Sequence, residues 1–95
     1  MKFPIKIYRV AEQSMEPSIE EGAYIVVNRN YWRLARGDAV VLKDPESSAV
    51  LVKRISSISG SRIFVIGDNR ALSRDSRNFG EVGRRDLVGK VMLVI

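Results

Sequence analysis

The sequence has 95 residues, 45% of them apolar, and a net charge of +5 from 16 basic and 11 acidic side chains. A chain of this length forms one small domain with a modest core. It contains no histidine and no cysteine, which excludes disulfide bonds, a serine–histidine triad, a cysteine nucleophile and an ordinary zinc site. No apolar run approaches the roughly 20 residues that span a bilayer, so we expect no transmembrane segment. We also expect no metal and no other cofactor.

Short stretches rich in β-branched and apolar residues, each bounded by turn-forming residues, indicate strands along most of the chain. No helical period runs for ten residues, and at most one helical turn is expected, near Tyr31–Ala35. Ser59-Gly60-Ser61 is typical of a hairpin connection. We expect strands at Ile5–Val10, Ala23–Val27, Asp38–Leu42, Ala49–Ile58, Arg62–Ile66 and Val88–Ile95.

Residues 67–85 form the longest stretch without a strand pattern. Loops longer than about 12–15 residues in a compact domain are usually functional or disordered. This stretch is dense in polar groups, and we expect hydrogen bonds to order it close to the functional site. The pattern as a whole predicts an all-β fold in one domain over residues 1–95. It would be a small closed or partly open barrel, or coiled sheets, of about six to eight short strands with a long polar loop.

With histidine and cysteine absent, a hydroxyl group activated by a lysine amine is a known alternative route to a nucleophile. A lysine accepts a proton only when it is neutral, whereas its unperturbed pKa is about 10.4. Burial favours the uncharged form and lowers that pKa. In a strand, Leu51, Lys53 and Ile55 point to one face. Lys53 would therefore lie between two aliphatic side chains, while Arg54 points the other way.

Taken alone, these residues leave simpler interpretations open. A serine before an apolar residue and a proline, as in Ser14-Met15-Glu16-Pro17, usually marks a turn. A lone lysine in a strand more often keeps its charged head in water. The Ser-x-x-Lys pattern of penicillin-recognising enzymes is absent, because position 17 is proline.

Five segments, in order, resemble the conserved boxes of the type I signal peptidases. Each box is a weak signal by itself, but the ordered set is specific and covers most of the chain from Ser14 onward. The short form is similar to the reduced relatives proposed to mature nickel-type superoxide dismutase by removing an N-terminal leader. The boxes are Ser14-Met15-Glu16-Pro17-Ser18-Ile19, Gly37-Asp38-Ala39-Val40-Val41, Val52-Lys53-Arg54-Ile55, Gly67-Asp68-Asn69-Arg70 with Ser73-Arg74-Asp75-Ser76-Arg77 and Phe79-Gly80, and Val88-Gly89-Lys90-Val91.

The resemblance implies a serine endopeptidase that removes a leader or signal peptide from a precursor protein through a Ser–Lys dyad. Ser14 would be the nucleophile, with its backbone N–H donating to the oxyanion, and Lys53 would be the general base. Ser73 matches the serine that orients the lysine. The other implied residues are Arg54 with Asp68 and Asp75 with Arg77 as structural ion pairs, and Gln13, Met15, Leu51 and Val52 as substrate contacts.

The chain departs from the family at three points. Position 12, where the family often has serine or glycine, is Glu12, and an ionised carboxylate cannot donate a hydrogen bond to an oxyanion. The family carries a membrane anchor before the nucleophile, and we expect none before Ser14. Thirteen residues separate Lys53 from Gly67, where the family usually carries a large β-rich insertion. Because the chain has no histidine, it fits the lysine-type branch better than the branches with a histidine base.

Two other functions stay open. One is a catalytically inactive relative used for binding, which Glu12 motivates. The other is a basic β-barrel module for nucleic acid or an anionic surface, with stacking by Tyr8, Tyr24, Tyr31 and Trp32. Since the second leaves the serine and lysine boxes unexplained, we expect a peptide leader as the partner and no nucleic acid. The charge also suits peripheral membrane association, and we expect a cytoplasmic protein or one at a membrane face.

Overall fold

The computed structural model describes residues 4–31 and 33–95, so the predicted stacking residue Trp32 lies outside the described part. Seven antiparallel strands form a single sheet in the order β1-β2-β7-β3-β4-β5-β6. The predicted all-β fold and its number of strands are confirmed. The strands are β1 (Ile5–Arg9), β2 (Tyr24–Asn28), β3 (Ala39–Lys43), β4 (Val50–Ser59), β5 (Arg62–Ile66), β6 (Val82–Gly83) and β7 (Leu87–Val94).

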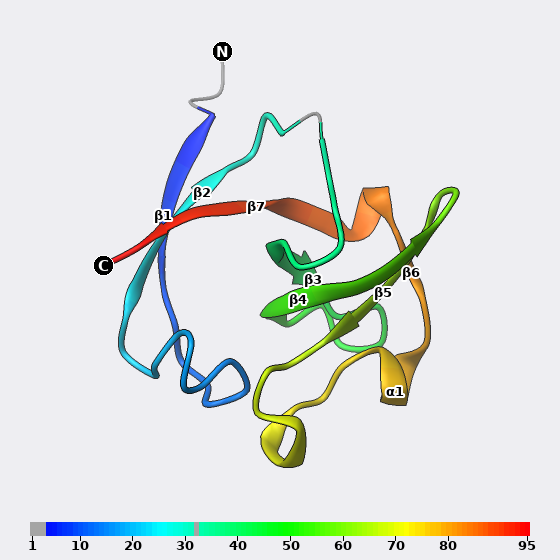
Figure 1. Cartoon of the computed structure of the whole chain (residues 1–95). Helices are drawn as coiled ribbons and strands as arrows, with labels where there is room; N and C mark the ends of the chain where they lie inside the picture. The colour runs from blue at the N-terminus through cyan, green and yellow to red at the C-terminus, as the bar shows by residue number, and fades with distance from the viewer. Residues whose placement is uncertain (1–3, 32) are drawn as a thin grey trace.

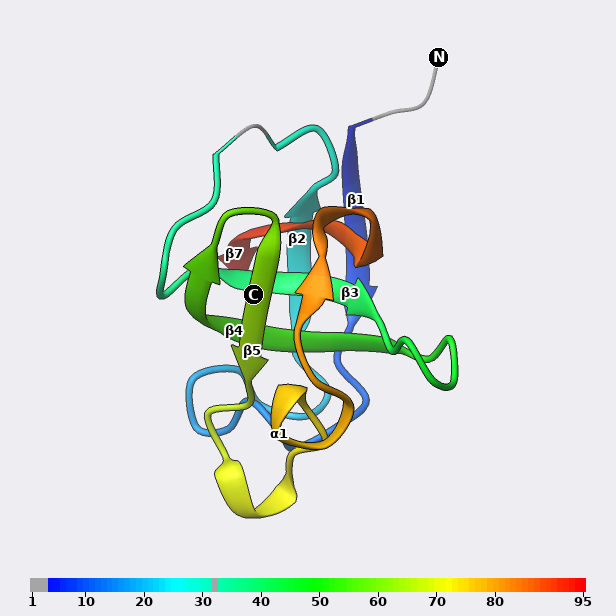
Figure 2. The ribbon, with the colours of Figure 1, turned by 90° about the vertical axis from the view of Figure 1, so that its right-hand side faces the viewer.

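The sheet curls into a partly open barrel. Figures 1 and 2 show β1 and β2 crossing β3 and β4 at a steep angle, with the polar segment after β5 lying near one end of the sheet. The register shifts between Val26 and Val27, between Val41 and Leu42, and between Ile55 and Ser57. Such bulges bend a strand and increase its twist, which accounts for the curl.

Two clusters of buried apolar residues meet at β3. Val40 and Leu42 belong to one cluster, whereas Val41 belongs to the other. Because alternate residues of a strand point to opposite faces, β3 has a core on each side, and all three of these residues are fully buried. The strand next to it, β4, therefore has a fixed position, and that strand carries Lys53.

Residues 67–85 depart from the irregular loop expected from the sequence. They contain two short helical segments, η1 (Arg70–Leu72) and α1 (Ser76–Phe79), and the two-residue strand β6, which pairs with β5. Elements of two to four residues are too short to show a period in the sequence. Asp75 and Asn78 cap the N-terminus of α1 with a reciprocal capping box. The third short helical segment, η2 (Arg84–Asp86), leads into β7.

The helical turn allowed near Tyr31–Ala35 is absent from the part of that stretch that the structure describes, where residues 33–35 have no regular structure. The turn comes at Arg36 and Gly37 instead. The Asp38 carboxylate accepts a hydrogen bond from the Ala35 N–H at 2.8 Å, and Gly37 has a φ of +95°. A positive φ favours glycine, so these residues make a local turn rather than a helix.

Candidate active site

Ser14 lies in the turn that follows β1, and it is 4% exposed. Asn69 holds the backbone there, because its N–H donates to the Ser14 carbonyl at 2.8 Å and its Nδ2 donates to the Gln13 carbonyl at 3.2 Å. The next side chain, Met15, is 1% exposed and packs in the second core cluster. The turn is thus fixed both by the core and by the segment after β5.

Lys53 lies on β4 with its side chain on the buried face. It is 1% exposed, and its same-face neighbours Leu51 and Ile55 are buried as well. The alternation expected along this strand is confirmed by its burial pattern. The Lys53 Nζ donates to the Ser73 hydroxyl at 3.2 Å.

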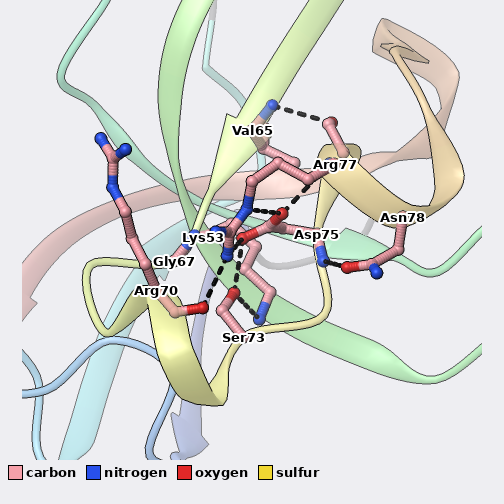
Figure 3. Close-up of polar contacts among 9 residues, drawn as sticks. Lys53, Val65, Gly67, Arg70, Ser73, Asp75, Arg77 and Asn78 are labelled. Atoms are coloured by element: carbon pink, nitrogen blue, oxygen red, sulfur yellow. Dashed lines mark hydrogen bonds and ion pairs between the residues drawn. The ribbon is translucent and has the colours of Figure 1, made fainter.

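A chain of hydrogen bonds continues from Ser73 (Figure 3). The Ser73 Oγ donates to Asp75 Oδ2 at 2.7 Å, and the Gly67 N–H donates to the same oxygen at 2.9 Å. Arg77 donates through its backbone N–H and its Nε to Asp75 Oδ1, at 3.1 and 2.9 Å, and through Nη2 to Oδ2 at 3.0 Å. The Arg77 Nη2 also donates to the Arg70 carbonyl at 2.8 Å. The carboxylate that holds Ser73 is therefore itself held by several donors.

The surroundings shift the pKa values of Lys53 and Asp75 downward for different reasons. Burial lowers the pKa of Lys53, and Arg77 adds to this, while the charges of Glu12, Asp75 and Asp44 oppose it. Burial alone would raise the pKa of Asp75, but the hydrogen bonds from Arg77, Gly67 and Ser73 outweigh burial and hold that pKa well below its usual range. The site thus combines a lysine whose pKa is lowered by burial with a carboxylate that stays ionised.

Gly67 is the point at which the serine turn and the lysine network meet. A Cβ atom at this position would lie 2.2 Å from the Ser73 Oγ and 2.7 Å from the Ser14 carbonyl oxygen. Both distances are shorter than the contacts that a Cβ atom makes, so a side chain here would displace the Ser14 carbonyl or the Ser73 side chain. The absence of a side chain at Gly67 lets the Ser14 carbonyl oxygen and the Ser73 side chain both lie against its backbone, and Ser73 in turn contacts Lys53.

The opposite face of β4 carries a different cation. The Arg54 Nε and Nη2 donate to the two Asp68 oxygens at 2.9 and 2.8 Å, and its Nη1 donates to the Gly37 carbonyl at 2.8 Å. The hydrogen bond to Asp68 raises the pKa of Arg54, and the hydrogen bond from Arg54 lowers the pKa of Asp68. This bidentate pair ties the segment after β5 to the outer side of the strand that carries Lys53.

An open groove with a volume of about 130 Å³ runs past Ser14. Among the described residues, β1 is an edge strand, and the first half of β4 pairs with β3 but not with β5, whose pairing begins at Arg54. The groove therefore lies between the end of the edge strand β1 and the part of β4 that β5 does not cover. Its walls come from the end of β1, the serine turn and the start of β4: Tyr8, Arg9, Val10, Ala11, Glu12, Ser14, Met15, Val41, Val50, Leu51 and Val52.

The four predicted substrate contacts have different positions. Leu51, Val52 and Met15 line the groove, although Leu51 and Met15 are also buried in the core. Gln13 does not line it: its side chain contacts Glu21, at 3.4 Å between Nε2 and Oε1, and its carbonyl is bound by Asn69. The side chain of Gln13 therefore turns toward Glu21 and is not part of the groove wall.

Comparison with known proteins adds the family. The sequence model of the family described as signal peptidase, peptidase S26, matches residues 1–63 and 56–95, which together span the chain. The chain belongs to this family. The resemblance drawn from the ordered boxes is confirmed at this level.

Two curated relatives have similar sequences. Signal peptidase I V of Bacillus subtilis (strain 168) is 25% identical over 138 aligned positions, which cover 88% of this chain and 82% of the relative. The mitochondrial ATP-independent inner membrane protease subunit 1b of Arabidopsis thaliana is 29% identical over 89 positions. That alignment covers 70% of this chain and 53% of the relative, so the chain spans about half the length of the plant protein.

Two features are absent from the described part of this S26 family chain. Across residues 4–31 and 33–95, no group of three or more acidic side chains is arranged to hold a metal ion. In the same part of the chain, no helix is long and apolar enough to cross a membrane.

Glu12, the residue that departs from the family pattern, is exposed and lines the groove.

The sequence did not point to three features of the site. Gly67 has no side chain and so leaves room for both serines, Asn69 holds the serine turn, and Arg74 forms an ion pair with Asp44. Gly67, Asn69 and Arg74 all lie in the fourth box that resembles the family, so the motif marked their positions but not their contacts, whereas Asp44 lies in none of the boxes. Asp44 and Arg74 are 30 residues apart, and nothing in their local patterns pairs them.

Proposed function

We propose that this chain is a serine endopeptidase that removes an N-terminal leader or signal peptide from a precursor protein by means of a Ser14–Lys53 dyad. The observation that supports this most strongly is the environment of Lys53, a fully buried lysine whose Nζ donates to a serine hydroxyl. Membership of the S26 family supports protease activity.

In the proposed reaction, neutral Lys53 takes the proton from the Ser14 hydroxyl while the Ser14 oxygen attacks the scissile carbonyl. The negative charge that develops on the carbonyl oxygen is stabilised by the backbone N–H of Ser14. The Lys53 ammonium then gives its proton to the departing amine, leaving a Ser14 ester. Water loses a proton to Lys53, attacks the ester and restores both groups.

Ser73 has the role of a positioning residue in this scheme. Its hydroxyl donates to Asp75 at 2.7 Å, so its lone pairs face the Lys53 amine. Held in this way, the amine keeps one orientation when it is neutral and when it is charged. Asp75 in turn is fixed by Arg77 and Gly67.

The groove supports binding of an extended peptide between the end of β1 and the start of β4. Free backbone groups on both edges can pair with a peptide, and pockets can select alternate side chains. The family's pockets accept small residues, so we propose cleavage after Ala, Ser or Gly, with a small or aliphatic residue two positions earlier. A peptide library cleaved mainly after large or charged residues would contradict this.

The test of the proposal is cleavage of leader peptides by the wild-type chain, followed by mass spectrometry. We expect a single cut after a small residue, and loss of that cut in Ser14→Ala. If Ser14→Ala cleaves as fast as the wild type, the serine mechanism is wrong. If neither protein cleaves any leader while both bind the peptides, the chain is an inactive relative, the alternative that Glu12 in the groove wall favours.

We also propose that the protein works at a membrane face, where precursors bearing leaders would meet it. The net charge of +5 supports attraction to anionic lipid. One relative is named as an inner membrane protease subunit. Co-sedimentation with anionic vesicles at low and high salt tests this, and equal recovery with neutral vesicles would count against it.

A further inference from the structure

A second buried carboxylate lies outside the Lys53 network. Asp44 follows β3, in the turn that leads to β4, and is 3% exposed. It accepts hydrogen bonds from Arg74 Nε at 2.7 Å, from Arg74 Nη2 at 3.3 Å and from the Glu46 N–H at 2.8 Å. The hydrogen bond from Arg74 holds the pKa of Asp44 below its usual range, so this buried group carries a charge at neutral pH.

Arg74 is held from three sides. Besides Asp44, its Nη2 contacts Glu46 Oε1 at 2.5 Å, and its guanidinium lies over the Phe79 ring, with Cζ 5.4 Å from the ring centre. A stacked and bidentate arginine has few orientations left. In the sequence Arg74 stands between Ser73, the partner of Lys53, and Asp75.

This ion pair joins two segments of the proposed active site. The turn at Asp44 is closed by bonds from the Asp44 N–H to the Ala49 carbonyl at 2.7 Å and from the Ser48 N–H to the Asp44 carbonyl at 2.9 Å. It leads directly into Val50–Lys53, the half of β4 that has β3 as its one ladder partner. Arg74 therefore ties this half-strand to the segment that carries Ser73.

We propose that Asp44 and Arg74 are positioning residues for the Ser14–Lys53 reaction: their ion pair fixes the groove end of β4 against Ser73 and neutralises a buried charge that faces Lys53. This inference rests on the proposed function. It adds two residues that the family boxes do not explain as a pair.

The charge balance around Lys53 gives the inference a measurable consequence. Three carboxylates, Glu12, Asp75 and Asp44, favour its ammonium form, while Arg77 opposes it. Of the charged groups facing Asp44, Arg74 is the counterion and Glu46 is a further acid. Without Arg74, the charge of Asp44 would act on Lys53 uncompensated, and the base would be neutral in a smaller fraction of molecules at a given pH.

The test is a double-mutant cycle of Arg74→Met, Asp44→Asn and the double variant, measured as the pH profile of kcat/KM on a leader peptide. We expect Arg74→Met to shift the profile toward alkaline pH and to lower kcat/KM at neutral pH by roughly three- to tenfold. Asp44→Asn should shift the profile toward acid pH. The double variant should bring it back toward the wild type, because it removes both charges together.

Arg62→Met is the matched control, since Arg62 forms an exposed ion pair with Glu81 and its side chain is 64% exposed. We expect its profile to overlay that of the wild type. If Arg74→Met does not fold, Arg74→Lys keeps the charge without the bidentate geometry and should give a smaller alkaline shift.

An ion pair that merely stabilises the fold would lower the urea midpoint of the single variants without moving the profile. Profiles of folded Arg74 and Asp44 variants that overlay the wild type would overturn the inference, even with a lower urea midpoint. Failure of the proposed function gives a different result, because Ser14→Ala would then match the wild type.

Discussion

Two neighbouring basic residues on β4, Lys53 and Arg54, lie in opposite environments. Lys53 is 1% exposed, hydrogen-bonds a neutral hydroxyl, and has a pKa lowered by burial. Arg54 has a side chain that is 35% exposed, forms a bidentate pair with Asp68, and has a pKa raised by that pair. One peptide bond separates them. Successive residues of a strand point to opposite faces. Lys53 is therefore a buried candidate base, while its neighbour Arg54 forms an ion pair nearer the surface.

The position of a side chain, rather than its residue type, sets the chemistry on this strand. A carboxylate in direct contact with Lys53 would favour its charged form, whereas the structure places the Ser73 hydroxyl there and the Asp75 carboxylate one bond further on. Asp68 makes the corresponding direct contact on the other face. Four variants test this contrast.

The largest effect is expected for Lys53→Arg. Arginine keeps the charge on a slightly longer side chain, but it does not become neutral in proteins and cannot act as the base. We expect kcat/KM on a leader peptide to fall by about three orders of magnitude or more, as for other dyad or triad members. Lys43→Arg is the matched control, because Lys43 is exposed at the end of β3, and it should cleave normally. Retention of activity in folded Lys53→Arg would exclude a lysine base.

A smaller loss is expected for Ser73→Ala. The variant leaves the Lys53 amine without the hydroxyl that fixes it, but both reacting groups remain. We expect kcat to fall about 10- to 100-fold with little change in KM, consistent with a group that orients a base. Steady-state kinetics at saturating peptide measures this. An effect as large as that of Ser14→Ala would give Ser73 a direct part in the reaction instead.

Arg54→Met should act mainly on stability. It leaves Asp68, whose side chain is 20% exposed, without its partner. Because the pair is partly exposed, we expect a loss of about 1–2 kcal/mol in the free energy of unfolding, with kcat/KM reduced less than in Ser73→Ala. Urea denaturation of the variant beside Arg62→Met measures the difference. Equal stability of Arg54→Met and the wild type would remove the structural role of the pair.

The smallest effect is expected for Glu12→Ser. Glu12 lines the groove, and its charge raises the pKa of Lys53 against the effect of burial. Removing that charge should lower the apparent pKa of the kcat/KM profile and increase the rate at neutral pH by a few fold. Glu21→Ser, on an exposed glutamate of the neighbouring turn, is the control and should leave the profile in place. An unchanged Glu12→Ser profile would show that the carboxylate does not act on the base.

The sequence allowed much of the fold to be predicted, because β-branched runs and turn residues mark the longer strands well. It missed β6 and α1, which consist of two and four residues and depend on pairing with β5 and on the caps of Asp75 and Asn78. Strand alternation placed Lys53 on the face of Leu51 and Ile55, but it left open whether the charged end reaches water, and only the structure shows the side chain buried.

Contacts between distant segments were not readable in the same way. The need for a glycine at position 67 depends on how closely the serine turn and Ser73 lie to its backbone. The Asp44–Arg74 pair depends on the fold of the segment after β5. Such contacts join residues that share no local pattern, so only the assembled chain reveals them.

The proposed lysine base is tested by the pH profile of kcat/KM for the wild-type chain on a leader peptide. Because burial lowers the pKa of Lys53, the neutral base is present at a lower pH than in free lysine, whose pKa is about 10.4. We expect activity to rise from acid toward alkaline pH and to level off well below that value. A profile that still climbs steeply above about pH 10 would mean an unperturbed lysine and would contradict the proposed dyad.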